Sequence, residues 1–350
     1  MLKFKIVLLF VIVLLSANSY LSSQNKSEYK IVCVAFYNLE NLFDTIIDPD
    51  TSKILQEEFT PKGKNAWTGE HYWEKIGNMA KVISEIGTDV TPDGVTVLGV
   101  SEIENISVLE DLVKDPAIKD RNYKIVHYDS PDKRGIDVGL LYQEKYFTVK
   151  SSRSVELVMD DPDFKTRDQL LVSGILDGEE INFIVNHWPS KRGGEKRTMP
   201  KRIAAADLGK HIIDSLSGIN PNTKTILMGD LNDNPFSVSV KKHLNTVGNE
   251  QDLVEGTLFN PMETFEKKGI GTSAYRDVWS VIDQIILTPN LIGEDKSTFK
   301  FHKASIFNKK YLIQKNGKYA NYPFRTYSFG IYKGGYSDHF PVLIYLIKEK

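Results

Sequence analysis

The sequence predicts an α/β protein whose sheets and helices are arranged in layers. Short apolar segments with the composition of β-strands recur along the chain, and amphipathic segments with helical periodicity lie between several of them. This mixture is typical of layered α/β folds. No segment rich in Pro, Gly or Ser divides the 350 residues, so we expect one domain over residues 28–350. The composition, with 41% hydrophobic and 26% charged residues, is ordinary for a globular protein.

Nine segments are predicted to be strands because they are short, apolar and rich in β-branched residues. Most show no alternation of polar and apolar residues, so both of their faces should be covered, as in the core of a sandwich. The single cysteine, Cys33, lies in the first of them and is expected to be a core residue. In chain order the segments are 31–37, 95–100, 123–128, 137–142, 170–176, 181–185, 225–228, 283–287 and 341–347.

Three helices are predicted between these strands, over 71–87, 107–114 and 199–216. In the first, apolar residues recur at steps of three and four, which gives the helix one apolar face. Gly87 follows as a C-terminal stop. The segment 289–336 stays unassigned.

The N-terminal segment 1–23 has the layout of a secretory signal peptide. Lys3 and Lys5 precede ten apolar residues, and small and polar residues follow. A membrane-spanning helix needs about 20 apolar residues, so cleavage, after Ser19 or after Ser23, is favoured over retention as an anchor. No cysteine stands directly after the apolar run to carry a lipid. We therefore expect a secreted or periplasmic protein.

Carboxylate, amide and imidazole side chains stand at the ends of predicted strands, where a layered fold presents its chemistry. A carboxylate there costs desolvation energy unless a partner compensates it, and a divalent metal ion is a natural partner. Carboxylate and amide oxygens suit Mg²⁺, Mn²⁺ or Ca²⁺. The absence of nearby thiols argues against a structural zinc site, while zinc held by histidines stays open. The residues are Asn38, Glu102, Asn186, His187, Asp230, Asn232, Asp283, Asp338 and His339.

Two of these residues, His187 and His339, add acid and base capacity. An imidazole beside a carboxylate is held in one tautomer and is favoured as a cation, which stabilises negative charge developing on a phosphoryl group. Carboxylates, histidines and a metal ion together suit hydrolysis of a phosphate ester better than acyl transfer. The chain has neither a GxSxG elbow nor a GxxxxGK[ST] phosphate loop.

The motifs resemble those of the endonuclease/exonuclease/phosphatase superfamily, most closely its predicted bacterial extracellular nucleases. The resemblance covers nearly all of the chain that follows the N-terminal segment. It implies a four-layer αββα sandwich, in which two mixed sheets pack face to face with helices outside and the site lies at one rim. The matching segments are FYNLENLFD (36–44), LGVSEIEN (98–105), DVGLLY (137–142), VNHWPSKRGG (185–194), LMGDLND (227–233), VIDQIIL (281–287) and GYSDHFPV (335–342).

The resemblance also implies roles for individual residues. Glu102 and Asp338 resemble metal-binding carboxylates, and Asn38 resembles the asparagine beside the metal. Asp230 resembles the aspartate that orients the attacking water, and Asn232 resembles the asparagine that holds a phosphate oxygen. The expected cofactor is Mg²⁺ or Mn²⁺, with Ca²⁺ as an alternative.

The histidines are placed by the same resemblance. His339 resembles the histidine of the SDH motif, Asp283 the aspartate that orients it, and His187 a second catalytic histidine. Two positions depart from the family pattern, because Ser101 stands where many members have Gln and Gln284 where many have an aromatic residue. Neither departure removes an essential group, but both weaken inference about the substrate.

The formal net charge of −2 is not that of a strongly basic nucleic-acid binder. Basic residues are nevertheless concentrated at 190–202 and at 300–318. Because Lys191 and Arg192 closely follow the second histidine, we interpret them as contacts for substrate phosphates, which would make binding sensitive to salt. Trp188 either stacks on a base or packs in the core.

Together these features predict a secreted, metal-dependent phosphodiesterase, most simply an endonuclease that hydrolyses DNA or RNA. The alternative is a phosphomonoesterase or a lipid-headgroup phosphodiesterase, of inositol-phosphate or sphingomyelin type, on the same scaffold. A third hypothesis, a catalytically inactive binding module, predicts missing active-site groups, and none is missing. We expect a nucleic-acid substrate, no stable protein partner, no membrane contact after signal removal, and a monomer.

Overall fold

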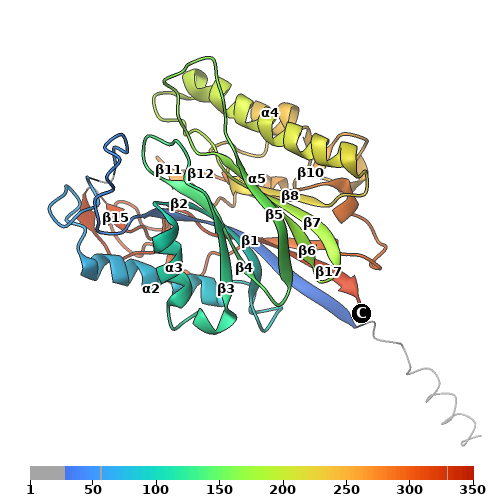
Figure 1. Cartoon of the computed structure of the whole chain (residues 1–350), viewed down its shortest axis with the longest axis horizontal. Coiled ribbons are helices and arrows are strands. Elements are labelled where there is room, and N and C mark those ends of the chain that lie inside the picture. The colour runs from blue at the N-terminus through green and yellow to red at the C-terminus, as the bar shows by residue number, and fades with distance from the viewer. Residues whose placement is uncertain (1–27, 56, 329) are drawn as a thin grey trace, which may run out of the picture.

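The computed structural model describes residues 28–350 except 56 and 329, and two mixed β-sheets packed face to face form its centre (Figure 1). The layered fold class predicted from the sequence is confirmed. The predicted signal peptide at 1–23 lies outside the described residues. Within the described part of the chain, no helix is long and apolar enough to cross a bilayer.

The first sheet has six strands in the order β14-β17-β1-β2-β4-β3. Its central strand β1 pairs in parallel with β2, and all other neighbours in this sheet are antiparallel. The strands are β1 (Tyr29–Leu42), β2 (Val95–Ile103), β3 (Tyr123–His127), β4 (Asp137–Gln143), β14 (Lys300–Ile306) and β17 (Val342–Glu349).

The second sheet has seven strands in the order β5-β6-β7-β8-β13-β10-β9. Strands β7 and β8 are parallel, and β13 returns antiparallel to β8. The strands are β5 (Phe147–Val155), β6 (Gln169–Leu176), β7 (Glu179–His187), β8 (Thr225–Asp230), β9 (Thr246–Val247), β10 (Leu258–Phe259) and β13 (Asp283–Leu287). Two small hairpins lie outside the sheets, β11 (Ser273–Tyr275) with β12 (Val278–Ser280) and β15 (Tyr327–Ser328) with β16 (Ile331–Tyr332).

Helices cover the outer faces of both sheets (Figure 1). Helix α4 (Glu195–Ile219) connects the parallel strands β7 and β8 and packs its apolar side on the second sheet. Helices α2 (Gly69–Glu85) and α3 (Ile106–Lys114) pack on the first sheet. In the described part of the chain, a further short helix, α5 (Glu263–Lys267), precedes β11.

The inner faces of the two sheets form one continuous apolar core. At Gly99 in β2, a Cβ atom would lie 3.0 Å from Sδ of Met228 in β8 and 3.2 Å from a methyl carbon of Val185 in β7. Glycine at this position therefore lets the sheets approach closely. Because β1 and β2 lie against β7 and β8, the ends of these strands meet at one rim of the sandwich.

The nine strands and three helices predicted from the sequence are present. The apolar pattern does not predict β5 and β14, and the reason is their position. Both are edge strands with exposed polar residues, so their sequences lack a continuous apolar run. Helix α4 begins at Glu195 rather than at Met199, because its first turn is polar and exposed.

Candidate active site

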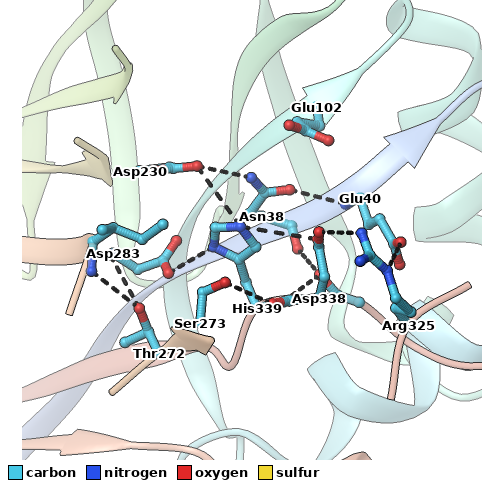
Figure 2. A network of polar contacts seen from close by, with 12 residues as sticks. Asn38, Glu40, Glu102, Asp230, Thr272, Ser273, Asp283, Arg325, Asp338 and His339 are labelled. Carbon is cyan, nitrogen blue, oxygen red and sulfur yellow. Dashed lines mark hydrogen bonds and ion pairs between the residues drawn. The ribbon is translucent and has the colours of Figure 1, made fainter. Parts of the chain in front are cut away.

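The residues singled out at the strand ends come together at this rim. Asn38 in β1 and Glu102 in β2 come from the first sheet, while His187 in β7, Asp230 in β8 and Asp283 in β13 come from the second. Figure 2 shows Asn38, Glu102, Asp230 and Asp283 at this rim. In the second sheet, Asp230 pairs in register with His187 on one side and with Asp283 on the other. The sequence motifs are thus brought together by strand pairing.

The imidazole of His339, on the segment before β17, is buried between two carboxylates. Its Nδ1 lies 2.7 Å from Oδ2 of Asp283, and its Nε2 lies 3.9 Å from Oδ2 of Asp230 (Figure 2). Burial alone would lower the pKa of His339, but the charge and hydrogen bond of Asp283, together with the charge of Asp230, raise this pKa well above its usual value. His339 is therefore held as a cation, and the expected contact with Asp283 is present.

Asp230 is the central carboxylate of the rim. Its Oδ2 accepts a hydrogen bond from Nδ2 of Asn38 at 3.1 Å, and its Oδ1 accepts one from the backbone N–H of Asn232 at 2.9 Å. Burial, partly opposed by the neighbouring imidazolium of His339, raises the pKa of Asp230 to about 7. A carboxyl group with such a pKa can gain and lose a proton near neutral pH.

His187, the second buried histidine, differs from His339 in charge. Its Nε2 lies 3.8 Å from Oε1 of Glu102 and 3.6 Å from Oδ2 of Asp230, and its Nδ1 has no hydrogen-bond partner among the described residues. Burial, with the positive charge of Arg167, lowers the pKa of His187 well below its usual value. The rim thus combines a neutral and a cationic imidazole.

Asn232 follows Asp230 in a left-handed backbone conformation with φ of 51°. Its Nδ2 donates a hydrogen bond to the carbonyl of Trp188 at 2.9 Å. A side-chain amide has two N–H donors, so one remains for a ligand. Trp188 itself is 1% exposed, and its Nε1 donates to Oδ1 of Asn186 at 3.0 Å. Of the two alternatives for Trp188, base stacking is wrong and core packing is correct, since no ligand can reach the ring.

Glu102 and Asp338, the expected metal ligands, each face an arginine. Nη2 of Arg134 lies 3.4 Å from Oε1 of Glu102, and Nη2 of Arg325 donates to Oδ2 of Asp338 at 2.7 Å. Oε2 of Glu102 accepts the backbone N–H of Asn41 at 3.0 Å. Carboxylate and amide oxygens are the donors that a hard divalent cation prefers, so the chemical types of Glu102, Asp338 and Asn38 suit such an ion.

A second group of ligand atoms, from Asp230, Asp283 and His339, lies within 4.8 Å of one another. Because Nδ1 of His339 is already bonded to Asp283, this group is better described as an acid–base cluster than as a set of metal ligands. Glu102 and Asp338 thus remain the metal ligands that the resemblance to the family implies.

Three charged residues that the motifs do not single out lie beside Asp338. Glu40 is buried, and its carboxylate accepts hydrogen bonds from Nε of Arg325 at 3.3 Å and from the backbone N–H of Thr326 at 2.7 Å. Burial raises the pKa of Glu40 to about 7. Lys75 in α2 is fully buried and donates to Oγ1 of Thr326 at 2.7 Å. Arg325 comes from the segment that the sequence left unassigned, and only the fold brings it to the site.

A buried ion pair between Arg167 and Asp132 contacts two segments that contribute residues to the rim. Nη1 of Arg167 donates to Oδ1 of Asp132 at 3.0 Å, while Nε and Nη2 donate to the carbonyls of His187 at 3.1 Å and Trp188 at 2.6 Å. Oδ2 of Asp132 accepts the backbone N–H of Arg134 at 3.0 Å. The pair therefore links the end of β7 to the loop that carries Arg134.

The basic loop after β7 contains one engaged and one free cation. Nζ of Lys191 lies 3.2 Å from Oδ1 of Asp233 and 3.0 Å from Oε1 of Glu195. Arg192 is exposed, and its guanidinium has no ion pair among the described residues. Arg202 of the same basic run is fully buried, and its Nε lies 2.8 Å from Oδ2 of Asp233. Only part of the run is therefore available to a substrate.

Two clefts adjoin the rim and share Ser190 and Arg192. The first, of about 400 Å³, also contacts Glu40, Arg134 and Arg325, and so lies on the side of the expected metal ligands. The second, of about 880 Å³, runs between the basic loop and the β11–β12 hairpin, with Asn232 in its wall. Buried acid–base groups thus stand beside a surface that extends in two directions.

A sandwich of two mixed sheets with carboxylates and histidines gathered at one rim is the architecture of a class of phosphoester hydrolases. A model of the endonuclease/exonuclease/phosphatase family matches residues 33–348, and the chain belongs to this family. The resemblance seen in the sequence motifs is confirmed. Members of the family hydrolyse phosphoester bonds, and this chain is an enzyme of that kind.

Solved structures of low sequence identity share the fold. A family protein from Bacteroides thetaiotaomicron is 17% identical over 92% of this chain and 99% of its own, with a TM-score of 0.57. A mannosyl-6-phosphatase from the same species is 17% identical over 90% of this chain and 99% of its own, with a TM-score of 0.53. D. rerio TDP2 complexed with a single-strand DNA product is 12% identical over 91% of this chain and 99% of its own, with a TM-score of 0.54. No sequence among curated proteins matches the chain.

Proposed function

We propose that the protein is a secreted, divalent-metal-dependent phosphodiesterase that cuts nucleic-acid strands internally. The observation that carries this proposal is the pair of clefts that flank the rim and share Arg192. Their volumes of about 400 and about 880 Å³ exceed what one phosphate group needs and suit a ligand that continues on both sides of the reacting phosphate. A strand lying across both clefts places its phosphate between them.

The acid–base groups fit in-line hydrolysis by water. Asp230, with its pKa near neutrality, orients the attacking water and takes its proton. The cationic His339 and the second N–H of Asn232 donate hydrogen bonds to the phosphoryl oxygens as negative charge develops. A divalent ion held by Glu102 and Asp338, beside Asn38, would supply Lewis-acid stabilisation of the phosphoryl group.

A second candidate function is hydrolysis of a phosphomonoester such as a sugar phosphate. Arg134 and Arg325 line the smaller cleft beside the expected metal ligands, and such a cationic cleft suits the dianion of a monoester. The similarity to a mannosyl-6-phosphatase supports this candidate, as the similarity to TDP2 bound to a DNA product supports the first.

Hydrolysis assays on the protein from about residue 24 separate the candidates. Supercoiled plasmid, single-stranded RNA, a hexose 6-phosphate, an inositol phosphate and sphingomyelin are offered in parallel with Mg²⁺, Mn²⁺ or EDTA. Metal-dependent nicking of plasmid that His339→Ala abolishes is the expected result. Release of phosphate from the monoesters, with both nucleic acids left intact, would contradict the nuclease proposal and establish the second candidate.

Secretion is proposed on the N-terminal pattern of Lys3 and Lys5 followed by ten apolar residues. We propose that the mature enzyme acts as a monomer. N-terminal sequencing of protein recovered from the periplasm or the medium tests secretion. The mass of this protein, measured by light scattering, tests whether it is a monomer. A protein that stays in the cytoplasm with residues 1–23 attached would contradict secretion.

A further inference from the structure

The β11–β12 hairpin forms one wall of the larger cleft. Its two turn residues, Arg276 and Asp277, have left-handed backbones with φ of 50° and 65°, as a tight two-residue hairpin turn requires. The hydroxyl of Tyr322 donates to Oδ1 of Asp277 at 2.7 Å and accepts the backbone N–H of Asp277 at 2.5 Å. These two hydrogen bonds fix the tip of the hairpin against the rest of the protein.

The hairpin presents an aromatic ring with a cation over it. Tyr275, the last residue of β11, is 72% exposed although it lines the cleft. The guanidinium carbon of Arg276 lies 5.2 Å from the centroid of the Tyr275 ring, within the range of a cation–π contact. Val278, 64% exposed, stands beside them on β12. An exposed ring on a hairpin whose tip is hydrogen-bonded to the rest of the protein offers an apolar face to a ligand.

The opposite wall supplies positive charge and a link to the reacting centre. Arg192, whose guanidinium has no ion pair among the described residues, lies on the loop that closes the cleft. Asn232, bonded through its backbone to Asp230, lines the same cleft. A ligand in this cleft therefore has the acid–base cluster at one end, Arg192 along one side and Tyr275 along the other.

We infer that the larger cleft is a nucleobase subsite, in which the base next to the cleaved phosphate stacks on Tyr275. This inference rests on the proposed function. Every base has a π-face, so stacking on a tyrosine is tolerant of sequence, and Arg276 and Arg192 add attraction for the ring and for the adjoining phosphate. The volume of about 880 Å³ accommodates a nucleotide. The subsite gives the enzyme affinity for polynucleotide strands without base identity.

Binding measured without cleavage tests the subsite. The dissociation constant of a short fluorescent single-stranded oligonucleotide is measured by anisotropy in the His339→Ala background with Mg²⁺, for Tyr275→Ala, Tyr275→Phe and Trp73→Ala. Trp73 is an exposed aromatic on α2 that lines neither cleft, so it is a matched control. Tyr275→Ala is expected to weaken binding about 5- to 150-fold, the range of one base stack. Tyr275→Phe and Trp73→Ala are expected to bind as the background does.

An oligonucleotide with abasic sites at every position supplies the second arm. It is expected to bind more weakly than the base-containing strand, and Tyr275→Ala should change its affinity little. Equal affinity for both strands, or equal loss for both in Tyr275→Ala, would overturn the base subsite while leaving hydrolysis of the strand intact. If the active enzyme neither binds nor cuts either strand, the proposed function itself fails. Should His339→Ala not fold, the KM of the active enzyme serves, and Tyr275→Ala must raise it with kcat changed less.

Discussion

Nδ1 of His339 and Oδ2 of Asp283 lie 2.7 Å apart in the buried centre of the site. This contact opposes the effect of burial on the imidazole and keeps it cationic. The other oxygen of Asp283 is buried and has no hydrogen-bond partner among the described residues. The carboxylate of Asp283 thus bonds to His339 alone among the described side chains, so a substitution at Asp283 tests the role of this histidine.

Asp283→Asn is expected to lower kcat by about 10²- to 10⁴-fold, because the amide cannot stabilise the cation of His339. Steady-state kinetics on the cleaved substrate checks this, with circular dichroism to show that the fold is retained. Asp120→Asn, an exposed change of the same chemical kind, is the control and should keep full activity. A kcat within threefold of the wild type in Asp283→Asn would remove Asp283 from the site.

Removal of the metal is expected to abolish hydrolysis, and Mg²⁺ or Mn²⁺ should restore it. Glu102→Gln should weaken metal binding by about 10-fold or more, because one anionic oxygen ligand is lost. Isothermal titration calorimetry measures this without any substrate. Glu110→Gln on the exposed side of α3 is the matched control. Unchanged metal affinity in Glu102→Gln would show that the ion binds elsewhere.

Arg192 and Lys191 are expected to differ in their effect on substrate binding. Arg192→Ala should reduce the slope of log Kd against log salt by about one for a nucleic-acid ligand. Lys191→Ala should change the slope less, since its ammonium group already lies 3.2 Å from Asp233. Lys196→Ala, in the exposed first turn of α4, is the control. If Lys191 carried the larger effect, the ion pair with Asp233 would have to open on binding.

The Arg167–Asp132 pair is expected to be important for both stability and activity. Arg167→Met leaves Asp132 as an unpaired buried carboxylate and should cost about 3–5 kcal/mol in the free energy of unfolding. It also releases the carbonyls of His187 and Trp188, so kcat should fall. Urea denaturation measures the first effect, and the double variant with Asp132→Asn should recover part of it. A loss below 1 kcal/mol would mean that the pair does not stabilise the fold, and an unchanged kcat would mean that it is not coupled to the rim.

Glu179, far along β7 from the site, is expected to make stability depend on pH. Burial would raise the pKa of Glu179, but Lys224, Lys348 and the backbone N–H of Phe299 outweigh burial and hold the pKa below its usual value. A lowered pKa stabilises the fold above the unfolded value of about 4.3. This stabilisation is lost as the pH falls through the folded value.

Glu179→Gln should therefore unfold more easily than the wild type at pH 7, by about 1–3 kcal/mol. The two proteins should converge as the pH falls below about 4. Thermal or urea unfolding across this range checks the prediction. A constant difference at all pH values would show that packing, not charge, is responsible.

Much of the fold could be predicted from the chain because a buried strand has an apolar sequence that can be recognised without its neighbours. Runs such as 181–185 and 225–228 are largely apolar, as expected for a strand covered on both faces. Edge strands such as β5 do not have such apolar runs, because part of their surface is exposed to water. The polar residues at strand ends could be found for the same reason, since each interrupts an apolar run at a defined point.

Partners separated by long stretches of chain could not be predicted. The contact of Arg325 with Asp338, the burial of Glu40 and the pairing of Arg167 with Asp132 depend on which segments pack together. Trp188 and Lys191 have sequence surroundings that suit an exposed ligand contact. Packing against α4 and the carboxylate of Asp233 nevertheless engage them within the protein.

The sequence by itself determined the layered fold, the family and the chemical types of the residues at the rim, because hydrophobic periodicity and short motifs are local properties of the chain. Only the tertiary structure decided the charge state of each group. The histidines His187 and His339 have the same chemistry in the sequence, yet burial and the positive charge of Arg167 keep the first neutral while Asp283 keeps the second cationic. That difference arises from desolvation and from charges a few ångströms away, which exist only once the chain has folded.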